Sequence, residues 1–180
     1  MVAMDPAFER IIDRCRDGDR EAFAEVVSRY GLQVLRTARL IVRDQQLAED
    51  VVQETFVRAW RRLGTLEHDD LGPWLLRIAT NESISAWRRR NRFQALAERF
   101  GRLREAPAGP SSEERMDLDR ALGRLLPELR AVVVLHYYQD LSVEDTARTL
   151  RQPVDTIKSR LKVALRRLRE LTGSKEDSNG

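Results

Sequence analysis

Apolar residues recur every three or four positions along most of the 180-residue chain, and this spacing predicts amphipathic α-helices. The segment 47–63 is the clearest case, because one face of a helix there collects a continuous apolar stripe. The stripe consists of Val52, Phe56, Ala59, Trp60 and Leu63. We expect it to lie in a hydrophobic core. Since prolines and glycines gather between such periodic segments, the pattern predicts an all-α protein.

One short segment departs from the helical pattern. Val132-Val133-Val134 has the composition of a β-strand, but the sequence offers no second strand to pair with it, and an isolated hairpin is marginally stable. We therefore predict that these valines lie in a helix that begins at Pro127.

Helix-breaking residues divide the chain into two parts. The segment 96–112 loses the apolar periodicity and gathers Pro, Gly and Ser, which is the composition of a linker. We predict two small helical domains, 1–95 and 113–172, joined by this flexible linker and followed by a polar tail, 173–180.

The second domain contains the pattern of a helix-turn-helix. Ser142 and Asp145 form a capping pattern at the start of a short helix that ends at Leu150. Arg151-Gln152-Pro153 supplies the turn, and a long basic helix follows over 154–171. This order is typical of proteins that place the second helix in the major groove of DNA.

The helix 154–171 has an apolar face and a basic face. The basic face suits phosphates, although such a face can also simply be solvated. Because helix-turn-helix proteins contact base edges with the N-terminal part of this helix, we expect the readers to be Thr156, Lys158, Ser159 and Lys162. Arg166 lies farther along, where phosphate or solvent is expected.

Asp155 interrupts the basic surface of this helix. Its carboxylate can favour the positive end of the helix dipole, or it can accept a hydrogen bond from a cytosine amino group.

The helix expected over 74–92 carries a polar strip of mixed chemistry. The strip consists of Arg77, Asn81, Ser85 and Arg88, beside Trp74. Single-stranded nucleic acid is bound by such a mixture, because cations follow the backbone and an aromatic ring can stack on a base. Trp74 can equally pack in a core, and core packing is the expectation for Trp60 and Trp87.

The second face of the helix 47–63 alternates charged with aliphatic residues. They are Asp50, Glu54, Arg58 and Arg61 with Leu47 and Val51. Exposed aliphatic side chains among charges indicate a protein partner rather than nucleic acid, since the acids would repel phosphates. Leu47 and Val51 can also be isolated apolar residues of an ordinary surface.

Composition and charge exclude several functional classes. The net charge is only +3, but Arg and Lys are concentrated locally. Cys15, His68 and His136 offer no metal-ligand spacing, and no nucleophile–base pair or phosphate-binding glycine loop is apparent, so neither a metal, a cofactor nor an enzyme is expected. With no signal peptide and no apolar run near about 18 residues, we expect a cytoplasmic protein without membrane insertion.

Several segments, in order and spacing, resemble the bacterial extracytoplasmic-function (ECF) sigma factors of the sigma-70 family, over nearly the whole chain. Residues 48–56, AEDVVQETF, look like region 2.2 of that family. Residues 74–81, WLLRIATN, with WRRR at 87–90, are similar to regions 2.3 and 2.4. LPELR at 126–130 and DTIKSR at 155–160 look like region 4.

The resemblance implies an RNA polymerase sigma factor, which binds core polymerase, directs it to minus-ten and minus-thirty-five promoter elements and promotes DNA melting. The clamp coiled coil of the largest polymerase subunit would be contacted by Leu47, Asp50, Val51, Gln53, Glu54 and Arg58. The strip on the helix 74–92 would contact the separated minus-ten strand, and the loop 65–71 would capture a flipped base. The helix 154–171 would read the duplex minus-thirty-five element, and its domain would hold the polymerase flap.

The resemblance also implies an anti-sigma factor as a further partner, and we expect a monomer when the chain is free. The sequence departs from the family at Arg151 and Asp155, where glycine is usual, and at Ser85, where aspartate is common. A turn that requires a positive φ is strained without glycine. These departures bear on the promoter sequence rather than on the class.

A stand-alone helix-turn-helix regulator is the alternative function. It would use the same C-terminal helix without any dependence on polymerase. High-affinity binding of the isolated chain to specific duplex DNA would favour it.

Overall fold

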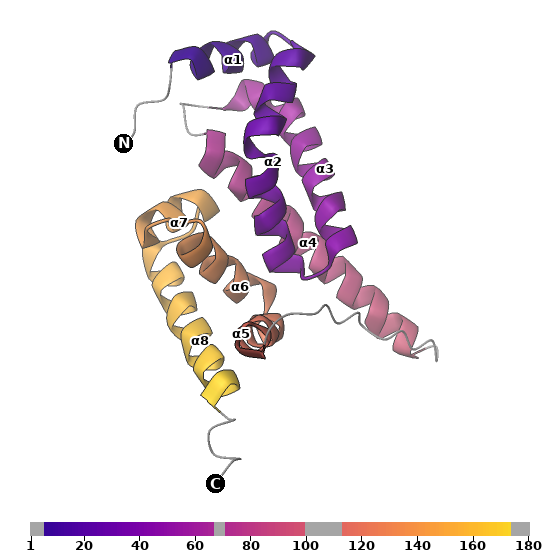
Figure 1. Ribbon diagram of the computed structural model, residues 1–180, viewed down its shortest axis with the longest axis vertical. Helices are drawn as coiled ribbons and strands as arrows, with labels where there is room; N and C mark the ends of the chain where they lie inside the picture. Colours follow the sequence, from indigo (N-terminus) through magenta and orange to yellow (C-terminus); the bar gives the residue numbers. More distant parts are fainter. Residues whose placement is uncertain (1–5, 67–70, 100–112, 174–180) are drawn as a thin grey trace. The chain divides into compact units, whose positions relative to one another are not determined.

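The computed structural model describes residues 6–66, 71–99 and 113–173, and every regular element within these ranges is helical (Figure 1). The prediction of an all-α protein is confirmed. The helices form two compact units, which divide within one long helix between Ser83 and Ile84.

The first unit is built from α1 (Pro6–Arg16), α2 (Arg20–Val42), α3 (Gln45–Arg62) and the first part of α4 (Leu71–Arg99), with a 3₁₀ turn, η1 (Leu63–Thr65), after α3. Aspartates define two of the helix starts. The Asp19 carboxylate accepts hydrogen bonds from the backbone N–H groups of Glu21 and Ala22, at 2.9 and 3.1 Å. Asp44 accepts from the N–H of Leu47 at 2.7 Å and so fixes where α3 begins.

Apolar side chains of all four helices meet in the core of the first unit. Phe56, Ala59 and Leu63 of the predicted stripe are buried there, and Cys15 is buried with them. Val52 packs against this core while half-buried, and the half-buried Trp60 meets Phe23 edge-on, with ring centroids 5.0 Å apart. The stripe on 47–63 therefore lies in the core, as predicted.

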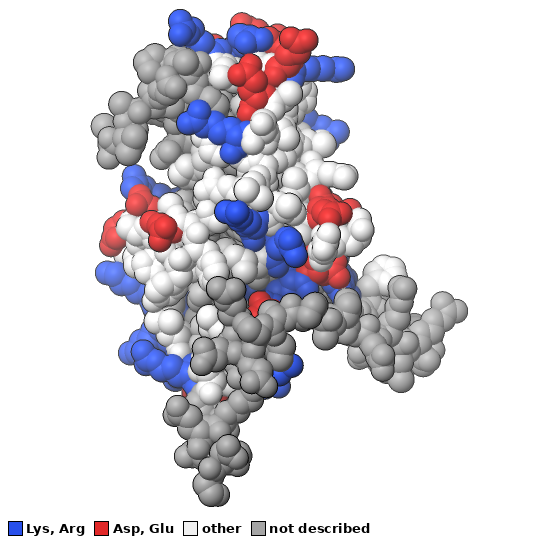
Figure 2. All heavy atoms as spheres, viewed as in Figure 1, with Lys and Arg blue, Asp and Glu red and all other residues white. Residues whose placement is uncertain are grey.

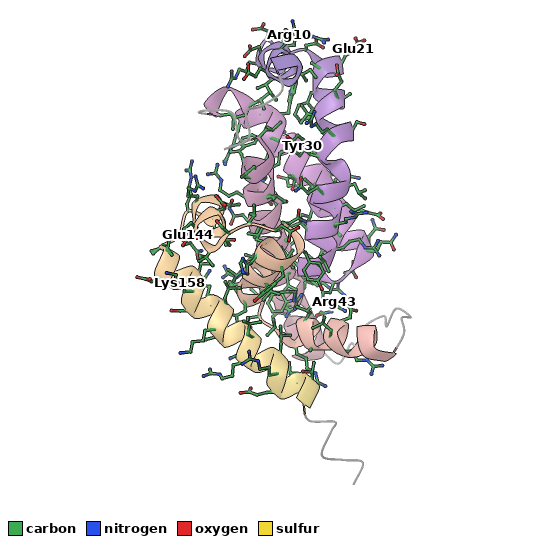
Figure 3. All side chains as sticks on the ribbon, turned by 60° about the vertical axis from the view of Figure 1, so that its left-hand side comes forward. Arg10, Glu21, Tyr30, Arg43, Glu144 and Lys158 are labelled. Carbon is green, nitrogen blue, oxygen red and sulfur yellow. The ribbon has the colours of Figure 1, made fainter. Side chains whose placement is uncertain are left out.

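The start of α4 approaches α2 closely at Gly72. A Cβ atom at this position would lie 3.3 Å from Cε1 of Tyr30, the α2 side chain labelled in Figure 3. The absence of a side chain at Gly72 therefore lets the first turn of α4 approach Tyr30 closely.

The helix α4 is longer than its sequence pattern suggests. It begins at Leu71 rather than at Trp74 and ends at Arg99, so that residues 96–99, predicted as linker, are helical. The residues Gln94-Ala95-Leu96-Ala97-Glu98 all favour helix, and the breakers Gly101 and Pro107 come only later in the sequence. A segment can therefore lose the apolar periodicity and still be helical, as residues 96–99 are.

The second unit takes up the rest of the described chain. After the remainder of α4, its elements are α5 (Glu113–Arg124), α6 (Pro127–Val133), the π-helical turn η2 (Val134–Tyr138), α7 (Val143–Leu150) and α8 (Val154–Gly173). Val132 and Val133 lie in α6 and Val134 opens η2, so the strand-like segment is helical as predicted. A second core joins α5, α6, α7 and α8.

Among the described residues, no helix combines the length and the apolar character that crossing a membrane requires.

Candidate nucleic-acid and protein interfaces

The rotation of α8 is fixed by the apolar face that it buries. The residues buried in the core of the second unit are Ile157, Leu161, Ala164 and Leu168. On the opposite side, the exposed residues include Lys158, Ser159, Lys162 and Arg166, and Thr156 is half-buried. Lys and Arg side chains gather along this helix in Figure 2, and Lys158 is labelled near its N-terminal end in Figure 3. All the predicted duplex contacts therefore lie on one helix, and four of the five are exposed.

The short helix before α8, α7, has a well-defined cap at each end. The Ser142 hydroxyl accepts a hydrogen bond from the N–H of Asp145 at 2.9 Å and so caps α7, as predicted. It also donates to the Asp145 carboxylate at 2.6 Å, which lowers the pKa of that carboxyl. Arg151 ends α7 with φ 51° and ψ 49°, in the left-handed region. Position 151, where glycine is usual in the family, therefore does have a positive φ in this structure.

Arg160 supports this turn from within α8. Its Nη1 donates to Oε1 of Gln152 at 2.6 Å, so this arginine ties the recognition helix to the turn. Arg160 and Gln152 are eight positions apart, and no spacing pattern in the sequence predicts this contact.

The polar strip of α4 runs along one side of a single continuous helix. Asn81, Ser85 and Arg88 are exposed, and Arg77 is half-buried. Trp74 is half-buried and packs against the core of the first unit, so its ring is at least partly committed to packing. Arg88 forms an ion pair with Glu128 of α6, so its charge lies beside a carboxylate, whereas Asn81 and Ser85 are exposed. The strip thus combines cationic, amide and hydroxyl groups over several turns, which is the composition expected for binding a single-stranded backbone.

The charged face of α3 is smaller than predicted. Asp50 and Gln53 are exposed, and Leu47 and Glu54 are half-buried. Val51, however, is only 3% exposed, so its predicted place on the partner surface is wrong. Ala48 and Thr55, one turn before and after it, are also buried, and they widen the core stripe enough to include Val51.

Arg58 does not extend from the charged face of α3 toward solvent, because its guanidinium pairs with two carboxylates of the first unit. Its Nε lies 2.5 Å from Oε1 of Glu54, and its Nη1 lies 2.5 Å from Oε1 of Glu82 on α4. The hydrogen bond to Glu54 is the main reason that the pKa of Arg58 is raised. Glu82 is only 5% exposed, so Arg58 supplies a countercharge to a buried carboxylate.

The predicted base-capturing loop, 65–71, falls largely outside the described residues, which omit 67–70. Leu66 and Leu71, at its edges, are buried in the core of the first unit.

Two family models match separate parts of the chain. Sigma-70 region 2 matches residues 26–93, and sigma-70 region 4 matches residues 115–168. The ECF RNA polymerase sigma factor SigM of Mycobacterium tuberculosis is 35% identical over 161 residues, covering 87% of this chain and 80% of that protein. The chain belongs to the ECF sigma factors.

Other sigma factors agree with this assignment. SigE of Mycolicibacterium smegmatis is 34% identical over 163 residues, and the match covers 85% of this chain and 63% of that relative. The sigma factor RpoE of Bartonella quintana, solved with the anti-sigma factor NepR, superposes with a TM-score of 0.68 at 29% identity, covering 85% of this chain and 98% of RpoE.

The candidate residues of this sigma factor fall within the two matched regions. The α3 face and the α4 strip lie in region 2, and the exposed residues of α8 lie in region 4. Two residues that support these surfaces were not identified from the sequence: Glu82, which pairs with Arg58, and Arg160, which contacts the turn before α8. Both contacts depend on packing, and the one signal for Glu82 is an acid among apolar positions of α4.

Proposed function

We propose that this sigma factor binds core RNA polymerase through α3 and contacts promoter DNA through α4 and α8. Leu47, Asp50, Gln53 and Glu54 would meet the clamp coiled coil of the largest subunit. The α4 strip would track the separated minus-ten strand, while Lys158, Ser159 and Lys162, with Thr156, would read the minus-thirty-five duplex and Arg166 would contact phosphate. The second unit would also engage the polymerase flap.

The observation that carries this proposal is the difference between the two basic surfaces. The basic face of α8 follows a capped helix and a tight turn, which suits entry into a major groove. The α4 strip mixes arginines with Asn81 and Ser85, and it suits the backbone of a single strand. A stand-alone duplex-binding regulator would have no use for the second surface.

The polymerase interface is tested by titrating labelled protein with core polymerase. Asp50→Ala and Gln53→Ala remove exposed groups without touching the core, so we expect each to weaken the complex about tenfold, as for a contact worth about 1.4 kcal/mol. Glu21→Ala removes an exposed acid from α2, outside the proposed interfaces, and serves as the control. Unchanged affinity in both α3 variants would contradict the proposed interface.

The promoter can be found by run-off transcription with the reconstituted holoenzyme on a genomic promoter library. Arg77→Ala, Asn81→Ala and Arg88→Ala are then expected to lower melting of the selected promoter, while affinity for core polymerase is retained. If the chain instead binds the selected duplex tightly in the absence of polymerase, and the reconstituted holoenzyme produces no transcript, the chain is a stand-alone regulator.

We further propose an anti-sigma factor as a partner, because a structural relative was solved in complex with one. Tagged protein recovered from its native host should carry a bound inhibitor that must be removed before core polymerase can bind. Recovery of a fully polymerase-competent chain with no bound protein, under non-inducing conditions, would contradict this.

A further inference from the structure

The contact between Arg58 and Glu82 joins the helix that carries the proposed polymerase face to the helix that carries the proposed minus-ten strip. Both residues lie in the first unit, Arg58 on α3 and Glu82 on α4. The Arg58 Nη1 and the Glu82 Oε1 are 2.5 Å apart. Glu82 directly follows Asn81, whose side chain is exposed on the strip.

The carboxylate of Glu82 is costly to bury without a cation. Its side chain is only 6% exposed, whereas that of Arg58 is 40% exposed. A buried carboxylate that loses its partner must keep an uncompensated charge, take up a proton or move toward water. Because Glu82 follows Asn81 on α4, a rotation of α4 that brought Glu82 toward water would also redirect the strip.

The geometry of Arg58 is suited to holding two helices at once. Its planar guanidinium presents several N–H donors in fixed directions, and here Nε faces Glu54 while Nη1 faces Glu82. With both directions occupied, the guanidinium is committed to contacts inside the unit. Glu54, one turn before Arg58 on α3, holds the guanidinium in place from the same helix.

We propose that Arg58 is a positioning residue, which sets the rotation of α4 by neutralising Glu82, and not a contact to polymerase. This rests on the proposed function, because the strip on α4 must be a DNA-binding surface for its direction to matter. Glu82 is then a further residue on which minus-ten binding depends, although it does not itself touch DNA.

The test compares Arg58→Met, Glu82→Gln and the double variant in the full chain. Arg36→Met is the control, because it removes an exposed arginine from α2 of the same unit, outside both proposed surfaces. Three quantities are measured: the Tm, the affinity for core polymerase, and the affinity of the holoenzyme for a fluorescent single-stranded minus-ten oligonucleotide from the selected promoter. Binding is measured at low temperature, where circular dichroism shows each variant to be folded.

Arg58→Met is expected to lower the Tm by about 10 °C or more, because it strands a buried charge. It should also weaken oligonucleotide binding by about tenfold, while Arg36→Met changes the Tm by less than about 2 °C. Adding Glu82→Gln should return both quantities to near the values of Glu82→Gln alone. If the contact were purely structural, adding Glu82→Gln would still restore the Tm, but oligonucleotide binding would be the same in all three variants as in the parent. That result would overturn the proposal.

The double variant keeps the proposal falsifiable if Arg58→Met does not fold, since it contains no unpaired buried charge. It should bind core polymerase with unchanged affinity. If the double variant binds polymerase about tenfold more weakly, Arg58 serves the polymerase face, either by direct contact or by holding Glu54, and the proposal is wrong. The proposed function fails separately, through unchanged polymerase affinity of Asp50→Ala and Gln53→Ala, variants that leave Arg58 and Glu82 intact.

Discussion

Arg130 shows how a single buried cation can organise the helices around it. The side chain is only 1% exposed, and its guanidinium donates to the carbonyls of Leu122, Gly123 and Leu125, at 2.8, 2.9 and 2.7 Å. These carbonyls lie at and just beyond the C-terminal end of α5, where carbonyl groups lack partners within the helix and the helix dipole is negative. The guanidinium of Arg130 thus supplies hydrogen-bond donors to three backbone carbonyls at the end of α5.

Replacing Arg130 by methionine is expected to destabilise the second unit by about 3 kcal/mol, because the buried carbonyls would lose their donors. Arg124→Ala, which removes an exposed arginine from the end of α5, should cost less than about 0.5 kcal/mol. Urea unfolding followed by circular dichroism measures both. A loss below about 1 kcal/mol for Arg130→Met would show that water replaces the guanidinium at these carbonyls.

The left-handed conformation of Arg151 makes a second prediction at the level of one residue. A side chain with a Cβ pays about 1 kcal/mol in this region, and glycine does not. Arg151→Gly should therefore be more stable than Arg151→Ala by about 1 kcal/mol in thermal unfolding, although both lose the same charge. Equal stability of the two variants would mean that the turn relaxes to negative φ when arginine is removed.

At the scale of the element, the start of α2 depends on an ionised side chain. The pKa of Asp19 is lowered, first by the hydrogen bond from the backbone N–H of Ala22 and next by that from Arg14. A carboxyl with a depressed folded pKa stabilises the fold above its unfolded pKa of about 3.9, and this contribution is lost as the pH falls through the lower, folded pKa.

Asp19→Asn keeps a capping oxygen but removes the charge, so it should lower the Tm at pH 7. The difference in Tm between the parent and this variant should shrink as the pH falls below about 4, because the carboxyl is protonated first in the unfolded chain and only at lower pH in the folded one. Asp17, an exposed neighbour, provides the matched Asp17→Asn control. A Tm difference that stays constant between pH 7 and pH 3 would mean that the charge of Asp19 contributes nothing.

The helix α8 makes a prediction that separates base contacts from phosphate contacts. Lys158→Ala and Lys162→Ala should each cost about 1–3 kcal/mol on the selected minus-thirty-five duplex, and less on a scrambled one. Arg166→Ala should weaken both duplexes alike and reduce the slope of log K against log salt by about one. Holoenzyme binding at several salt concentrations measures these effects, and a uniform loss for Lys158→Ala would make it a phosphate contact.

At the scale of the whole molecule, the sequence predicts what local periodicity determines and misses what depends on packing. The helices and the caps at Ser142 follow from spacing within a few residues. The pairing of Arg58 with Glu82 does not, since it depends on how α3 and α4 pack together. Val51 was misplaced for a related reason, because the small residue Ala48 and the polar Thr55 widened a core stripe that only large apolar side chains had defined.

The two proposed DNA contacts lie on separate helices, so promoter recognition should depend on the spacing between the two elements of the promoter. Inserting about 5 bp between them turns the minus-thirty-five site by half a turn of B-DNA and removes it from α8 when α4 holds the minus-ten element. Transcription should fall, and Lys158→Ala should then cause no further loss, whereas on the parent promoter it does.

The same insertion placed upstream of both elements is the control and should change nothing. If Lys158→Ala lowers transcription equally on both spacings, α8 contacts DNA without reading a site at fixed distance, and the bipartite mode of recognition is wrong.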